Sequence, residues 1–189
     1  MSSALDLIGN TPMVKLSRIT SGIDANVYAK CEFLNPSGSI KDRIALRMVE
    51  EAERRGKLRK GGTIIDATSG NTGPALSFVG SVKGYRVRLF IPAKWAGEYN
   101  PQNRIRIMES FGAEVEAFST EGYERLLEGL SPSEMSAAVF AIGTKKCYDL
   151  ETSDPTVWWA DQGYNPDNAL AHRETTGREI LEQLDNEVD

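Results

Sequence analysis

The chain has few of the residues on which metal and disulfide chemistry depends. Its 189 residues include one histidine, His172, and two cysteines, Cys31 and Cys147. A metal site built on several histidines, or a serine–histidine–aspartate triad, is therefore a poor explanation of this sequence, and we predict no metal ligands. Two free thiols are the simplest state of the cysteines in a cytoplasmic protein, with one disulfide between them as the alternative.

Long apolar runs and an excess of positive charge are missing too. No segment approaches the length of about 20 apolar residues that a membrane span requires, and residues 1–10 lack the basic and apolar stretches of a secretory signal. We therefore expect a cytoplasmic protein with no membrane partner. Lysine and arginine total 22 against 27 acidic residues, for a net charge of −5. Proteins that bind nucleic acid are usually basic, so this balance argues against that class.

Short apolar runs alternate with segments of helical periodicity, which predicts an α/β fold with a parallel sheet. In residues 41–56, for example, apolar side chains recur at intervals of three and four, and charged side chains occupy the opposite face. The predicted strands are 27–34, 63–67, 86–91, 113–118 and 145–150, and the predicted helices are 41–56, 73–83, 103–111, 123–130, 133–141 and 176–184.

The first loop with a chemical use is residues 35–43, with the sequence Asn-Pro-Ser-Gly-Ser-Ile-Lys-Asp-Arg. Ser39 and Asp42 have the spacing of a helix-capping pair, which places Lys41 in the first turn of a helix. The positive end of the helix dipole and partial burial both disfavour the ammonium form. A neutral amine is what a lysine needs to form a Schiff base. A solvated helix start is the alternative, and the local pattern alone favours it.

The second loop is residues 68–74, with the sequence Thr-Ser-Gly-Asn-Thr-Gly-Pro, between a predicted strand and a predicted helix. Pro74 suits the first turn of a helix, where its missing N–H leaves no bond unmade. Backbone N–H groups with the Ser69, Asn71 and Thr72 side chains would form a small pocket for a carboxylate or a phosphate. An ordinary capped turn is the alternative. The sequence has neither the phosphate-binding pattern Gly-x-x-x-x-Gly-Lys-Ser/Thr nor the dinucleotide-binding pattern Gly-x-Gly-x-x-Gly. No nucleotide site is therefore predicted.

Together the two loops resemble those of the pyridoxal-phosphate enzymes of the cysteine synthase family, the O-acetylserine sulfhydrylases. Further matching stretches follow in the same order and at similar spacing as far as about residue 184. Ordered motifs over that length are much more specific than either loop alone. The matching stretches are Ile8 to Pro12, Asn35 to Arg43, Thr68 to Gly73, Gly112 to Glu114, Gln162 to Pro166 and Thr175 to Ile180.

The resemblance implies a two-domain, parallel-sheet α/β fold of the tryptophan synthase β type. Residues 1–45 and 151–189 would belong to a large cofactor-binding domain, and residues 46–150 would form a small inserted α/β domain. Family members continue further, through a glycine- and threonine-rich loop that grips the cofactor phosphate. No Gly-Thr-Gly-Gly-Thr-like run occurs here. The fold is therefore expected to be incomplete at the C-terminus, as a fragment of a longer enzyme, with half of a split enzyme or a non-catalytic relative as alternatives.

The resemblance also implies pyridoxal 5'-phosphate as cofactor and β-replacement on an O-activated L-serine, with sulfide as nucleophile and L-cysteine as product. Lys41 matches the Schiff-base lysine that removes the α-proton, and Asn71 matches the asparagine that hydrogen-bonds the ring hydroxyl of the cofactor. A homodimer is implied, and a chain that supplies the missing C-terminal part is a further expected partner. The substrate carboxylate would be bound by Thr68, Ser69, Asn71, Thr72 and Gln162.

Other members of the same fold stay open as alternatives, including cystathionine β-synthases, serine or threonine dehydratases and diaminopropionate-forming enzymes. The motifs at 35–43 and 162–166 favour the synthases. Residues 94–103 lack the usual Ser-x-Glu-Arg helix start of the family, and residues 119–157 match it poorly, so substrate selectivity is left open. A chain that keeps the scaffold and binds a protein partner without catalysis is a hypothesis of a different class. It predicts that no cofactor binds.

Overall fold

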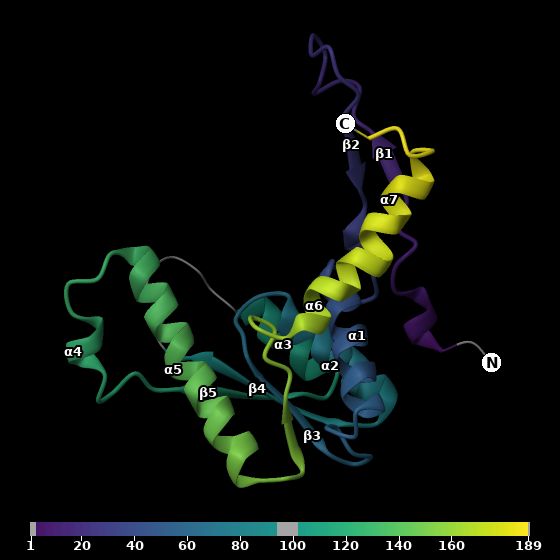
Figure 1. Cartoon of the computed structure of the whole chain (residues 1–189). Helices are drawn as coiled ribbons and strands as arrows, with labels where there is room; N and C mark the ends of the chain where they lie inside the picture. Colours follow the sequence, from purple (N-terminus) through teal and green to yellow (C-terminus); the bar gives the residue numbers. More distant parts are fainter. Residues whose placement is uncertain (1–2, 94–101, 189) are drawn as a thin grey trace.

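A four-stranded parallel sheet with helices on both faces forms the body of the molecule (Figure 1). The computed structural model describes residues 3–93 and 102–188, so most of the 94–103 segment lies outside the described residues. The strand order is β5-β4-β3-β6, and each neighbouring pair is parallel. The predicted α/β fold with a parallel sheet is therefore confirmed. The strands are β3 (Thr63–Ala67), β4 (Arg86–Pro92), β5 (Glu114–Phe118) and β6 (Val157–Trp159).

Different helices cover the two faces of the sheet. Helices α1, α2 and α3 pack on one face, where Ile64 joins Met48 and Leu76 in a buried apolar cluster. Helices α4 and α5 cover the other face, where Ile65 packs in a second cluster with Cys147. Successive residues of a strand point to opposite faces, so the apolar run of β3 contributes to both clusters. The helices are α1 (Lys41–Arg54), α2 (Thr72–Lys83), α3 (Gln102–Ser110), α4 (Glu124–Leu127) and α5 (Pro132–Ser153).

The predicted strand at residues 145–150 is wrong, because these residues belong to α5. Ser131 begins this helix with a capping box to Glu134, and its buried face continues past residue 141 to Cys147. The apolar side chains that suggested a strand are the last turns of that face. The edge strand β6 was not predicted, since three residues are too few to show a period.

An arm made of both ends of the chain projects from the sheet (Figure 1). Strands β1 and β2 pair in an antiparallel hairpin, and α6 continues through a π-helical turn into α7 beside it. The predicted strand at 27–34 ends early, and its last residues form a 3₁₀ turn. The elements are η1 (Ala4–Leu7), β1 (Met13–Lys15), β2 (Tyr28–Lys30), η2 (Glu32–Leu34), α6 (Pro166–Ala171), η3 (His172–Gly177) and α7 (Arg178–Gln183).

The sheet takes strands from both sides of the domain boundary predicted at residue 150. Strand β6 is hydrogen-bonded to β3, with Val157 opposite Thr63. The segment 151–189 therefore supplies a strand to the sheet of the segment 46–150, while the two-domain division stays a prediction. Within the described ranges, no helix combines the length and the hydropathy that a bilayer span requires.

Candidate active site

Three of the sequence motifs meet at one buried side chain, the guanidinium of Arg43 in α1. Its Nε and Nη2 donate to the two carboxylate oxygens of Glu32 at 2.7 and 2.8 Å. Its Nη1 and Nη2 donate to those of Glu179 at 2.6 and 2.7 Å. The hydroxyls of Thr175 and Thr11 each lie 3.2 Å from the guanidinium. The Arg43 side chain is only 1% exposed. We call these five residues the Arg43 clasp.

The N-terminal motif completes this clasp through its backbone. The N–H of Asn10 donates to Glu179 at 3.0 Å, and the N–H of Gly9 donates to Oδ1 of Asn35 at 2.9 Å. Gly9 has a φ of +85°, a conformation that strains any residue with a side chain. A Cβ there would also lie 3.1 Å from Nη1 of Arg43, so the guanidinium would have to shift. Much of the sequence that carries the resemblance therefore holds α1, α7 and the N-terminal segment together.

The charges of the clasp stabilise one another strongly. Burial alone would raise the pKa of Glu179, but hydrogen bonds from Arg43 and Lys30 and from the N–H of Asn10 outweigh it and lower the pKa to about 2. Burial likewise acts to raise the pKa of Glu32, and its bonds to Arg43 hold that pKa below the usual range. Both carboxylates are therefore ionised around the same guanidinium at neutral pH.

We expect the clasp to make folding sensitive to acid. The folded-state pKa of Glu179 lies below the ordinary value of 4.5, so its contribution is complete above about pH 4.5 and is lost as the pH falls toward 2. The shift corresponds to on the order of 3 kcal/mol of unfolding free energy. Urea unfolding between pH 7 and pH 3 measures the loss. Glu179→Gln should flatten this pH dependence, whereas Glu182→Gln, exposed on the same helix, should leave it unchanged. An unaltered profile in Glu179→Gln would contradict the expectation.

Lys41 is the first residue of α1, as predicted. Its backbone N–H donates to Oγ of Ser39 at 3.1 Å. The predicted pairing of Ser39 with Asp42 is wrong, because the Asp42 carboxylate accepts from the N–H of Ser37 at 2.7 Å and from its hydroxyl. The Lys41 side chain is half-buried. Burial lowers the pKa of His172, and the charge of Lys41 lowers it further, so His172 lies near the start of α1.

The N-terminal ends of α1 and α2 lie at the same end of this helix pair. The helices pack against each other, and their C-terminal ends are joined by an ion pair between Nζ of Lys83 and Oε2 of Glu53 at 2.8 Å. The hydroxyl of Tyr85 donates to the same carboxylate, also at 2.8 Å. The positive ends of both helix dipoles therefore point to the side that carries Lys41 and Thr72. Such ends favour a carboxylate or a phosphate.

The structure brings Gln162 to the loop predicted to bind the substrate carboxylate. Oγ1 of Thr72, at the start of α2, donates to Oε1 of Gln162 at 2.5 Å, and the two residues are 90 positions apart. Thr68 and Ser69 lie in the same loop, where Oγ1 of Thr68 accepts from the N–H of Gly70 at 3.3 Å. Two separate stretches of sequence thus meet at one place, and the carboxylate role of these residues stays a prediction.

Asn71 makes a contact that the sequence did not predict. It is exposed, and its Oδ1 accepts from Nε of Arg104 in α3 at 2.9 Å. The Asn71 side chain does not cap α2. The amide that the resemblance assigns to the cofactor hydroxyl is therefore bound to a cation from α3. No local signal could have identified Arg104, because the contact joins a loop to a helix 33 positions later.

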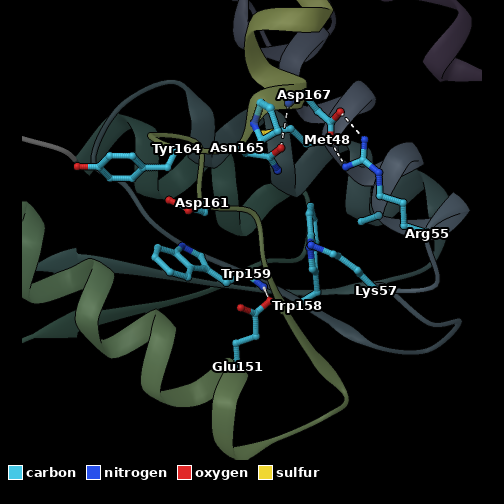
Figure 2. A pocket seen from close by; sticks show the side chains of 12 residues that line it. Met48, Arg55, Lys57, Glu151, Trp158, Trp159, Asp161, Tyr164, Asn165 and Asp167 are labelled. Carbon is cyan, nitrogen blue, oxygen red and sulfur yellow. Dashed lines mark hydrogen bonds and ion pairs between the residues drawn. The ribbon is translucent and has the colours of Figure 1, made fainter.

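A separate cavity of about 260 Å³ lies beside β6 (Figure 2). The predicted site residues, all of which are described, do not line it. The N–H of Trp159 donates to Oε1 of Glu151 at 3.0 Å, and the Arg55 guanidinium pairs with Asp167 at 2.6 and 2.9 Å. These residues line the cavity in Figure 2. The cavity therefore lies along residues 158–167, on either side of Gln162 in the sequence, but it does not contain the site residues that the motifs predict.

Comparison with known proteins places the chain in a family. The family model described as "Pyridoxal-phosphate dependent enzyme" matches residues 4–189. The chain belongs to this family. A cysteine synthase from a Flavobacterium species is 40% identical over 189 residues, which cover 99% of this chain and 54% of that protein. A cystathionine beta-synthase from Dictyostelium discoideum is 36% identical over 189 residues, which cover 100% of this chain and 34% of that protein.

A solved structure agrees in fold. The crystal structure of a hydrogen sulfide-producing enzyme from Fusobacterium nucleatum has a TM-score of 0.80 at 38% identity, and the match covers 100% of this chain and 56% of that one. The chain therefore spans between about a third and a little over half of the length of these relatives. The relatives carry two different enzyme names, so they do not decide which reaction this chain belongs to. The family match shows only that the chemistry depends on pyridoxal phosphate.

Proposed function

We propose that this chain is part of a cysteine synthase-type enzyme that catalyses β-replacement on an O-activated L-serine, with sulfide as nucleophile and L-cysteine as product. The observation that carries the proposal is the contact of Thr72 with Gln162 at the end of the helix pair where Lys41 begins α1. An amine beside a carboxylate pocket at two helix N-termini is what a pyridoxal-phosphate enzyme needs to bind an amino acid. The family match supports it.

The residues present fit the reactive end of pyridoxal phosphate. Lys41 would hold the cofactor covalently through Nζ, and Asn71 would hydrogen-bond its ring hydroxyl. When bound, the cofactor accepts the electron pair left at the substrate Cα. The Nζ of Lys41 would take the α-proton in that step. Residues that bind the cofactor phosphate are not assigned to this chain, which has no Gly-Thr-Gly-Gly-Thr-like run. The substrate carboxylate would be oriented by Thr68, Ser69, Asn71, Thr72 and Gln162.

Pyridoxal phosphate titration tests this proposal directly. The visible absorbance of the bound cofactor is followed, the sample is reduced with borohydride, and the labelled lysine is identified by mass spectrometry. We expect one label, on Lys41, that is lost in Lys41→Ala and kept in Lys57→Ala, a lysine of the separate cavity. The same titration is repeated with the C-terminal half of the Flavobacterium cysteine synthase added. Labelling scattered over several lysines, or no label in either sample, contradicts the proposal and favours a non-catalytic binding chain.

A cystathionine β-synthase-type reaction is the second candidate, favoured by the 36% identity with the Dictyostelium enzyme over the whole chain. Both reactions replace a group at Cβ of an amino acid, and they differ in the nucleophile that adds there. Parallel assays distinguish the two reactions. Protein in which pyridoxal phosphate labels Lys41 is assayed on O-acetylserine and on O-phosphoserine, once with sulfide and once with an organic thiol. Turnover with the organic thiol alone would replace the first proposal with the second.

The arm supports a proposal about partners. Its exposed apolar side chains include Ile19, Phe33 and Leu7, which are 82%, 69% and 68% exposed. Exposed apolar residues in such number normally belong to a protein–protein contact. We propose that they pack against polypeptide equivalent to the remainder of the longer relatives, and that the assembled enzyme is a homodimer. Other exposed apolar residues of the arm are Val14, Ile23, Leu34 and Leu181.

A further inference from the structure

Asp66 is a buried acid for which the proposed chemistry has no use. It lies in β3, directly before the loop that begins at Thr68, and it is 1% exposed. Its Oδ1 accepts from the indole Nε1 of Trp159 at 3.1 Å and from the N–H of Ala67 at 2.9 Å. Its Oδ2 has no hydrogen-bond partner among the described residues. An unsatisfied buried carboxyl oxygen is costly, so its retention calls for an explanation.

The contacts of Asp66 join the two segments that meet at the candidate site. Strand β3 leads from Asp66 into the loop that ends at Thr72, and β6 leads from Trp159 to Gln162. The indole of Trp159 binds Asp66, while its backbone N–H is held by Glu151 of α5. The backbone N–H of Gln162 makes no hydrogen bond of normal geometry to Asp66, but its dipole also favours the ionised form. Asp66 therefore ties the two segments together shortly before their ends come into contact through Thr72 and Gln162.

The surroundings of Asp66 are mostly acidic. Burial, helped by the negative charge of Asp161, raises the pKa of Asp66 to about 7, although the hydrogen bonds from Trp159 and from the backbone oppose the rise. Cys147 of α5 interacts with this acid, because burial and the charge of Asp66 both raise the pKa of its thiol. Lys146 and Glu151 of the same helix act on the Cys147 thiol in opposite directions, Lys146 lowering its pKa and Glu151 raising it. Asp66 thus changes charge close to neutral pH.

We propose that Asp66 is a positioning residue that holds Gln162 against Thr72 through Trp159, so that its protonation state sets the affinity of the site for the substrate carboxylate. The inference rests on the proposed function for the ligand, but its structural part concerns Asp66, Trp159 and Gln162 alone. A neutral Asp66 leaves the pocket favourable to an anion. An ionised Asp66 keeps its hydrogen bonds to Trp159 and Ala67, so Gln162 stays in place. Its negative charge nevertheless repels an anion in the pocket and weakens the binding of a carboxylate.

The structural part is tested without cofactor, by NMR on the chain labelled with ¹⁵N-tryptophan and ¹⁵N-glutamine. Trp159→Phe and Gln162→Glu assign the indole N–H of Trp159 and the side-chain amide of Gln162. Both resonances should shift between pH 5.5 and pH 8.5 with a common midpoint. In Asp66→Asn, which keeps the oxygen acceptor but does not titrate, both should be unmoved by pH. Stationary resonances in the wild type, or unchanged titration in Asp66→Asn, would overturn the inference even if pyridoxal phosphate labels Lys41.

The ligand part is tested on protein loaded with pyridoxal phosphate, by titration with L-cysteine. We expect wild-type affinity to fall about three- to tenfold from pH 6 to pH 8, since tenfold corresponds to one pKa unit of linkage. After correction for titration of the ligand amine, Asp66→Asn should show the low-pH affinity throughout. A purely structural role would change stability in Asp66→Asn and leave the pH profile of binding the same as in the wild type. Failure of the loading itself would count against the proposed function, while the NMR result still decides the role of Asp66.

Discussion

Replacing Arg43 with methionine is expected to lower the free energy of unfolding by about 3–5 kcal/mol, enough to unfold a marginally stable chain. The guanidinium is 1% exposed and binds two carboxylates, each through two nitrogens. Its removal leaves Glu32 and Glu179 buried beside each other without a counter-ion, and Lys30 compensates only Glu179, at 2.8 Å. Urea unfolding at pH 7, followed by circular dichroism, measures the loss.

Matched variants separate charge from geometry in the clasp. Arg43→Lys keeps the charge but cannot offer five donors in a fixed fork, so we expect it to lose most of the same stability. Arg47→Gln removes a neighbouring arginine of α1 that is 32% exposed and pairs with Glu174, and it should cost less than about 1 kcal/mol. The triple variant with Glu32→Gln and Glu179→Gln should recover part of the loss of Arg43→Met. Wild-type stability in Arg43→Met would show that the clasp contributes nothing.

Replacing Gly80 with alanine is expected to destabilise the fold by about 1–3 kcal/mol, although alanine is the better helix former. A Cβ at Gly80 would lie 2.3 Å from Cγ2 of Val87 and 3.4 Å from Cδ1 of Ile64. Val87 is 4% exposed and branched at Cβ, so it cannot rotate away as a long side chain would. Helix α2 would have to move off β4, which separates the helix from the sheet that positions its N-terminus.

A double-mutant cycle identifies that contact as the cause. Val87→Ala alone leaves a cavity and destabilises, but in combination with Gly80→Ala it makes room for the new methyl group. The double variant should therefore be more stable than the sum of the single variants predicts. Ser81→Ala, on the exposed side of the same helix, controls for helix propensity and should be neutral or stabilising. Additive effects of the two core changes would rule out the close approach of α2 to β4.

The sequence predicts the elements whose own side chains carry a strong period. Helix α1 and strand β3 fall within a residue or two of their predicted limits, because α1 has an apolar stripe and β3 a short apolar run between glycines and a loop. The edge strand β6 has three residues and no period, so only its pairing with β3 defines it. Residues 145–150 resemble a short strand when taken alone. Only the full length of α5, which begins at the capping box of Ser131, shows that they continue the buried face of a helix.

The site could be predicted only through the resemblance. Local patterns favoured a plain helix start at Lys41 and an ordinary turn at residues 68–74, because neither loop contains its own partners. The contact of Thr72 with Gln162 spans 90 positions, and that of Arg43 with Glu179 spans 136. Spacing within a sequence does not reveal contacts at such separations. The indole of Trp159 bound to buried Asp66 was missed for the same reason.

The Arg43 clasp also has a consequence for the order in which the molecule is made. Closing a loop of 136 residues costs conformational entropy that the contacts near Arg43 cannot offset on their own. On the ribosome, α1 and β3 emerge long before Glu179, so the sheet can assemble while Arg43 still lacks half of its partners. The helix start that carries Lys41 would therefore acquire its native surroundings only after Glu179 has left the ribosome. The side chain that we propose to bind the cofactor is thus held in its final setting only after residues far downstream of it have left the tunnel.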